Sequence, residues 1–114
     1  MNLATLALLL SLNLITLPMA LQDMAVQGEI DPALAECIVE VETGHTWNVL
    51  QRGLLDERGL FQILPSTALW VAGEMGWQDF ELADLDEPVK NMEMGLWILE
   101  RYPEWYSSIG LCAD

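Results

Sequence analysis

Apolar positions between residues 32 and 43 recur at the spacing of a helix. When each residue turns the chain by about 100°, one face collects Leu34, Cys37, Ile38 and Val41. Asp31 and Pro32 precede this stretch as an N-cap carboxylate and a proline at the first helical position, and Gly44 follows it. We therefore predict a helix over residues 32–43 that ends at Gly44.

The rest of the chain predicts two more helices and a small irregular hairpin. Between residues 45 and 63, short apolar pieces are separated by turn signals at Gly53 and at residues 56–59, a pattern that favours a hairpin. Pro65 opens a second helix that runs to about Met75.

A third helix is predicted from Pro88 to the residues before Pro103. Its apolar stripe is broad, which indicates a buried helix. Residues 79–85 are interpreted as an acidic connector. Residues 21–30 mix polar and apolar positions without a period, and we interpret them as a linker or a frayed first turn.

The first 21 residues contain no charged side chain, and residues 3–17 are nearly continuous hydrocarbon. Such a run is short for a membrane span, and Pro18-Met19-Ala20 resembles an imperfect cleavage site. We predict a signal peptide over residues 1–20 and one domain over residues 21–114. A retained N-terminal anchor or an internal helix is the alternative.

The net charge and the cysteine content limit which partners and which kinds of site the protein can have. The net charge is -14, with only four Lys and Arg residues, which disfavours nucleic acid and anionic membrane surfaces as partners. In an exported chain, Cys37 and Cys112 suggest one disulfide, and two buried free thiols are the alternative. With His45 they cannot assemble an ordinary zinc site, so we expect no metal and no cofactor.

Glu42 differs from the other glutamates of the first helix. Glu36 and Glu40 are four residues apart on the polar side, whereas Glu42 follows Ile38 by four and flanks the apolar face. Apolar neighbours and the negative end of the helix dipole both raise the pKa of a carboxyl, toward the range of a general acid. A boundary glutamate that reaches out to solvent is the alternative.

Three ordered motifs resemble the soluble-lytic-transglycosylase (SLT) type domain of the lysozyme superfamily. They are Glu42-Thr43-Gly44, the stretch from Gly59-Leu60-Phe61-Gln62 to Pro65-Ser66-Thr67-Ala68, and the segment Pro88-Val89-Lys90-Asn91 with Gly95. The resemblance covers about residues 32–101. It implies a compact, predominantly helical α+β domain, in which a small β-hairpin forms one lip of a substrate cleft.

The resemblance also implies roles for individual residues. Glu42 matches the catalytic acid and base, with Thr43 in place of the usual Ser beside it. Phe61, in place of Met, and Gln62 match the substrate-side motif. Asn91 and Gly95 match structural positions that fix the third helix against the second.

The chain lacks the Ala-Tyr-Asn segment whose Tyr points at the family's glutamate, so Tyr102 and Tyr106 are candidate stand-ins. A cysteine five residues before the catalytic glutamate, paired with one near the C-terminus, is also similar to animal-type lysozymes. That similarity favours a Cys37–Cys112 bridge.

The implied function is cleavage of the β-1,4 bond between MurNAc and GlcNAc in peptidoglycan glycan strands, in the periplasm or outside the cell. A single glutamate and a non-hydrolytic 1,6-anhydro product are expected, from a monomer or from part of a larger envelope or phage assembly. One alternative is a hydrolytic muramidase that uses Asp56 or Glu57 as its second carboxylate. Another is a catalytically silent glycan-binding domain.

Overall fold

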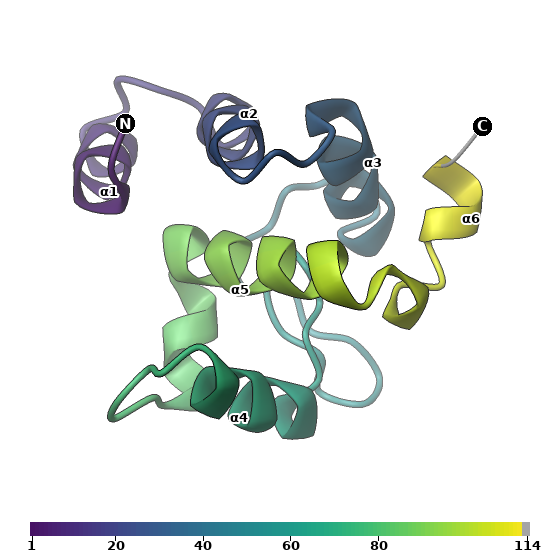
Figure 1. The fold of residues 1–114 in the computed structure, drawn as a ribbon. Helices are drawn as coiled ribbons and strands as arrows, with labels where there is room; N and C mark the ends of the chain where they lie inside the picture. The colour runs from purple at the N-terminus through teal and green to yellow at the C-terminus, as the bar shows by residue number, and fades with distance from the viewer. Residues whose placement is uncertain (113–114) are drawn as a thin grey trace.

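The computed structural model describes residues 1–112, and its regular secondary structure is almost entirely helical (Figure 1). Residues 113 and 114, the end of the predicted domain, lie outside the described residues. In chain order the elements are α1 (Leu3–Ser11), α2 (Leu17–Gln27), α3 (Pro32–Glu42), α4 (Pro65–Glu74), the 3-10 helix η1 (Leu82–Asp86), α5 (Pro88–Arg101), the 3-10 helix η2 (Pro103–Trp105) and the single turn α6 (Ile109–Cys112).

Helix α5 runs through the middle of the domain, with α2 and α3 on one side and α4 on the other (Figure 1). Its central position follows from its sequence, because apolar residues occupy most of its circumference. The buried residues of α5 are Val89, Asn91, Met92, Met94, Gly95, Leu96, Ile98 and Leu99. The predicted helices over 32–43, from 65 to 75 and from 88 onward are confirmed to within two residues at their ends.

The prediction of a linker over residues 21–30 is wrong, because α2 covers residues 17–27. The Thr16 side chain caps this helix, and Pro18 lies in its first turn, a start signal hidden inside the predicted signal peptide. One face of α2 is fully or nearly fully buried, formed by Ala20, Leu21, Met24 and Ala25. The proposed cleavage site therefore lies within a packed helix in this structure.

The predicted hairpin is reduced to two isolated antiparallel bridges, which pair Arg52 with Arg58 and Arg58 with Ile63. No strand longer than these bridges occurs among residues 1–112. The cause is local: the backbone has a positive φ at Asp56, Gly59 and Gln62, so turns follow one another too closely for an extended run.

Two residues of α5 hold this irregular loop. The Asn91 amide accepts from the Phe61 backbone N–H at 2.8 Å and donates to the carbonyls of Arg58 and Leu85 at 2.9 and 3.0 Å. At Gly95, an added Cβ would clash with Cγ of the Phe61 ring. These residues are structural, as the resemblance implied. They hold the loop around residue 60 against α5, whereas the resemblance implied that they fix α5 against α4.

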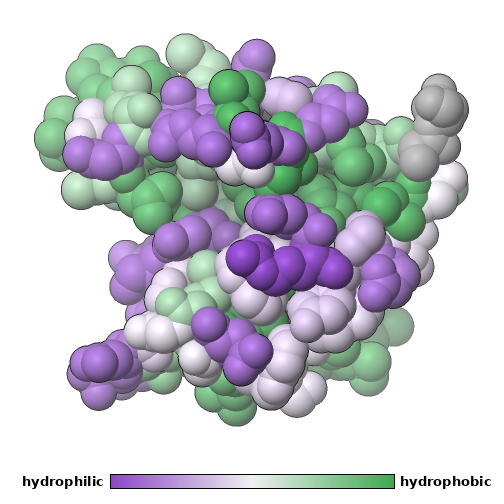
Figure 2. Space-filling model, viewed as in Figure 1, coloured by the Kyte–Doolittle hydropathy of each residue, from purple (hydrophilic) through white to green (hydrophobic). Residues whose placement is uncertain are grey.

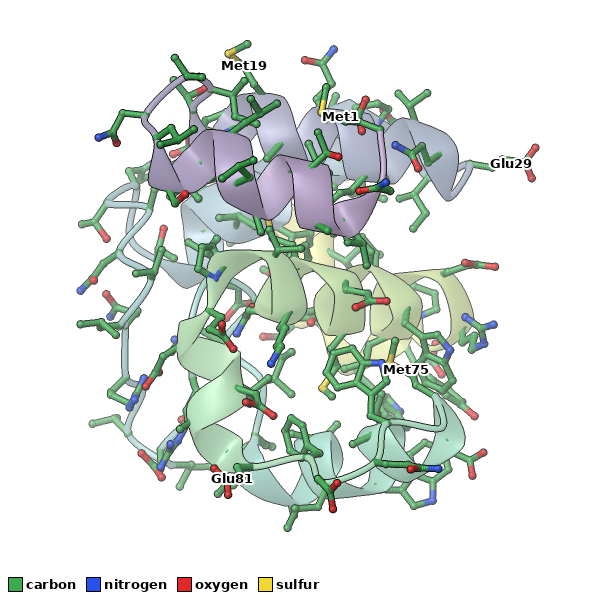
Figure 3. The ribbon with its side chains drawn as sticks, turned by 90° about the vertical axis from the view of Figure 1, so that its left-hand side faces the viewer. Met1, Met19, Glu29, Met75 and Glu81 are labelled. Carbon is green, nitrogen blue, oxygen red and sulfur yellow. A yellow bond between two sulfur atoms is a disulfide. The ribbon has the colours of Figure 1, made fainter. Side chains whose placement is uncertain are left out.

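The N-terminal helices form an outer layer with an apolar surface. Leu6 of α1 is 1% exposed, whereas Leu8, Leu12 and Leu14 face solvent. Figure 2 shows apolar surface at the α1 end of this layer, mixed with hydrophilic side chains along the rest of it, and Figure 3 places Met1 and Met19 on its outer side, away from α5. Among residues 1–112, no helix combines the length and the apolar character that crossing a membrane requires.

A disulfide joins Cys37 of α3 to Cys112 of α6, as predicted. Their Cα atoms are 5.7 Å apart, and the bridge closes a loop with a sequence separation of 75 residues. Figure 1 shows the consequence for the architecture, since α6 lies beside α3.

We predict that Gly95→Ala destabilises the fold by about 1–3 kcal/mol, because the new methyl group requires the fully buried Phe61 ring to move. Gly73→Ala in α4 is the matched control. Its Cβ meets nothing within 4 Å, so alanine should stabilise the helix by roughly 0.5–1 kcal/mol. Urea unfolding of both variants measures the difference, and equal effects would contradict close packing at Gly95.

Candidate active site

Glu42 is the last residue of α3, and the chain turns sharply after it. Gly44 and His45 both adopt a positive φ, of 58° and 65°, which ends the helix. The Thr43 hydroxyl reinforces this end by donating to the Val39 carbonyl at 2.8 Å and accepting from the Trp47 backbone N–H at 3.1 Å.

A polar contact also ties the exit segment back to α3. The Trp47 indole N–H donates to Glu40 at 2.8 Å, and Nδ1 of His45 lies 2.8 Å from the same carboxyl. These two hydrogen bonds, that of Trp47 first, lower the pKa of Glu40. Glu40 therefore serves as an anchor for the turn, and the neighbouring Glu42 is held at a defined helix end.

The Glu42 carboxyl is half-buried and has a raised pKa. Loss of hydration on burial is the main cause, and the charge of Glu57 adds to it. A hydrogen bond from the Ser108 hydroxyl to Oε2 of Glu42, 2.7 Å long, acts in the opposite direction. The protonated carboxyl is thus favoured in the way a general acid requires.

Tyr106 lies buried beside this carboxyl. Its ring packs edge-on against Phe61 with the centroids 6.0 Å apart. Burial, together with the charge of Glu42, strongly raises the pKa of the Tyr106 phenol, which keeps it protonated. Within residues 1–112, the Tyr106 hydroxyl has no hydrogen-bond partner, so this buried O–H donor is unpaired.

The loop of residues 51–63 contains further polar groups, of which Glu57 acts on the Glu42 carboxyl. Gln62, with a φ of 46°, donates from its amide to the carbonyls of Gln51 and Gly59 at 3.0 and 2.9 Å, and so braces the loop. Asp56 forms ion pairs with Arg52 and Arg58.

The Glu57 carboxyl accepts from the Leu55 backbone N–H at 2.7 Å. In contrast to Asp56, it is partly buried.

Tyr102 lies in an aromatic cluster on the surface. It stacks on Trp105 with the ring centroids 4.2 Å apart and the planes within 8°, and it meets Trp70 and Trp97 edge-on or tilted. Trp70 and Trp105 are each nearly half exposed.

The predicted substrate-binding residues therefore divide into two groups. Thr43, Phe61 and Tyr106 are buried, and their contact with substrate stays a prediction. Gln62 and Tyr102 are partly exposed, and their contact with substrate stays a prediction. The sequence reasoning missed Ser108, because no spacing rule connects a serine near the C-terminus to a glutamate in α3.

A cavity of about 890 Å³ lies elsewhere, between α1 and the start of α5. Leu3, Ala7, Leu10, Ile15 and Val89 line it, and Glu42 is not among its lining residues. Within residues 1–112, no three His, Cys, Asp or Glu side chains gather as metal ligands would.

A family model for the Transglycosylase SLT domain matches residues 19–113, which is most of the chain. The chain belongs to the SLT transglycosylase family. Neither a curated protein nor a solved structure matches it. Membership places the protein in the lysozyme-like superfamily and implies a peptidoglycan-degrading enzyme. The match begins within α2, consistent with the packing of that helix into the domain.

We predict that Glu42→Gln stabilises the SLT domain at neutral pH. The folded-state pKa of Glu42 lies above its unfolded value, so the contribution of the protonated carboxyl is fully present below the unfolded pKa and is lost as the pH rises through the folded pKa. Relative to the Gln variant, the wild type should lose unfolding free energy across this window. Urea unfolding from about pH 4 to about pH 8 measures the difference.

Glu36→Gln is the matched control, since Glu36 is an exposed carboxyl on the same helix. The difference between wild type and Glu36→Gln should vary little with pH. If Glu42→Gln gave the same flat profile, burial of Glu42 would not affect its ionisation.

Proposed function

We propose that the protein is a lytic transglycosylase that cleaves the β-1,4 bond between MurNAc and GlcNAc, with Glu42 as its catalytic acid and base. The observation that carries the proposal is the environment of Glu42. In a chain of the SLT family, this half-buried carboxyl with a raised pKa lies at the end of α3, where the family's catalytic glutamate is expected.

In the first step, protonated Glu42 donates its proton to the glycosidic oxygen, and the bond from that oxygen to C1 of MurNAc breaks. Positive charge then develops at C1, and the N-acetyl group of the substrate stabilises it. Burial supports this step, because it keeps the carboxyl protonated at a pH where an exposed glutamate has lost its proton.

In the second step, the carboxylate of Glu42 removes the proton of the MurNAc 6-hydroxyl. The freed oxygen bonds to C1 and closes the 1,6-anhydro ring, so Glu42 ends the cycle protonated. No water enters the reaction, and no second carboxylate is required to orient one. The hydrogen bond from Ser108 stabilises the intermediate carboxylate between the two steps.

Substrate contact is proposed at Gln62 and Tyr102, with Thr43, Phe61 and Tyr106 supporting the site from within. Export through residues 1–20 would bring the enzyme to its substrate in the periplasm or outside the cell. The disulfide agrees with such an oxidising compartment.

A hydrolytic muramidase on the same fold is the second candidate, and one observation favours it. The charge of Glu57 is close enough to raise the pKa of Glu42, so a second carboxylate does act on the site. Asp56 is the weaker candidate for that role, because Arg52 and Arg58 already neutralise it.

The decisive test is mass spectrometry of the muropeptides that the protein releases from purified peptidoglycan. We expect 1,6-anhydro products, and a loss of at least about 100-fold in rate for Glu42→Gln, the usual contribution of an acid and base. Glu36→Gln should cleave like the wild type. Absence of products from folded wild-type protein would refute the enzymatic proposal and leave a glycan-binding domain.

Glu57→Gln separates the transglycosylase from the hydrolase. For the transglycosylase, we expect the rate to stay within about threefold of the wild type. Activity should be lost at a lower pH than in the wild type, because the pKa of Glu42 falls when a nearby negative charge is removed. For the hydrolase, the rate should collapse and the wild-type products should carry reducing ends. The second result would replace the proposed reaction.

A further inference from the structure

The Ser108–Glu42 hydrogen bond joins two segments that the disulfide also joins. Glu42 ends α3, and Cys37 precedes it by five positions in the same helix. Ser108 immediately precedes α6, and Cys112 follows it by four positions in that turn. The bridge and the hydrogen bond are therefore two links between the same pair of segments.

We propose that Ser108 is a positioning residue for Glu42, and that the Cys37–Cys112 disulfide holds Ser108 in contact with it. The inference rests on the proposed role of Glu42 as acid and base. It adds a residue that is absent from the motifs and a function for the disulfide beyond stability.

The geometry of the hydrogen bond explains how Ser108 acts. Its hydroxyl donates to Oε2 of Glu42 at 2.7 Å, and Ser108 itself is only 3% exposed, so the donor has few alternative partners. A bond to one carboxyl oxygen restricts rotation of the carboxyl group. The other oxygen is then presented in a constant direction, which an acid needs in order to meet the glycosidic oxygen.

Apart from the disulfide, the packing of α6 rests on Ile109, which is partly buried against the core. The helix is a single turn, and none of its residues is buried. Leu111 is 77% exposed and Gly110 has open space around it. The chain before Ser108 is secured by the buried Tyr106, whereas the chain after it is secured by the partly buried Ile109 and, at the end of the turn, by Cys112.

The charged and titratable groups that face the Glu42 carboxyl come from two other segments. They are Glu57 in the loop, whose charge raises the pKa of Glu42, and Tyr106 before α6, whose own pKa is raised by burial and by the charge of Glu42. Ser108 alone favours the carboxylate. Its removal should therefore raise the pKa of Glu42 further and extend activity to higher pH, while the loss of positioning lowers kcat.

The first experiment compares Ser108→Ala with Ser107→Ala, its exposed neighbour, in the full-length oxidised protein. Carbon-detected NMR of the glutamate side chains follows the titration of Glu42, and rates are measured on purified peptidoglycan. We expect an upward shift of the Glu42 midpoint and a fall in kcat of about tenfold for Ser108→Ala alone, with KM little changed. Equal titrations and equal rates in both variants would overturn the positioning role.

The second experiment asks whether the disulfide acts through Ser108. Ser108→Ala is made in the wild type, in Cys37→Ser/Cys112→Ser, and in a variant with two glycines inserted after Gly110. The insertion lengthens the segment between Ser108 and Cys112 but keeps the disulfide. It therefore gives a result even if the variant without cysteines fails to fold. We expect Ser108→Ala to have almost no further effect in either altered background. Additive effects in the insertion variant would refute the link.

The two proposals fail in different ways. If the wild type releases no muropeptides but Ser108→Ala still shifts the Glu42 midpoint, the catalytic proposal fails and the positioning contact stands. If the wild type is active and the midpoint does not move, the contact has no role and the catalytic proposal stands.

Discussion

The side-chain amide of Asn91 forms hydrogen bonds that stabilise the part of the fold without regular secondary structure. The segment between α3 and α4 lacks a sheet, so its backbone groups cannot be satisfied by a ladder. Asn91 replaces that ladder by accepting from the Phe61 N–H and donating to the Arg58 and Leu85 carbonyls. Each buried group left unpaired would cost about 1–3 kcal/mol, so Asn91, together with Gln62 and the backbone hydrogen bonds inside the loop, gives the loop a defined conformation.

The same constraint reaches the candidate active site through packing. Asn91 fixes the backbone of Phe61, and Gly95 lets its ring lie directly on α5. The Phe61 ring in turn packs against Tyr106, which is buried beside Glu42. The burial that removes water from Glu42 therefore depends on a series of contacts that begins in α5. The raised pKa of Glu42 thus depends on residues outside its own helix.

Local signals predicted much of this arrangement. Asp31-Pro32 and Gly44 marked the ends of α3 correctly, and the spacing from Ile38 placed Glu42 on the flank of the apolar face, where the structure has it half-buried. The start of α2 was missed because its cap, Thr16, lies in a segment with the composition of a signal peptide. The contact from Ser108 spans 66 positions, and only the folded chain brings such partners together.

Electrostatics at the site are set by neighbours more than by the net charge of -14. At physiological salt, interactions between exposed charges fade beyond about 8 Å, so distant carboxylates contribute little to the site. Glu57 is near enough to act on Glu42, and its negative charge has two effects in the same direction. It adds to burial in favouring the protonated carboxyl, and in the proposed reaction it would favour the positive charge that develops on the sugar as the bond breaks. Ser108 opposes only the first effect, and in the proposed reaction its hydrogen bond would be most favourable once Glu42 has given up its proton.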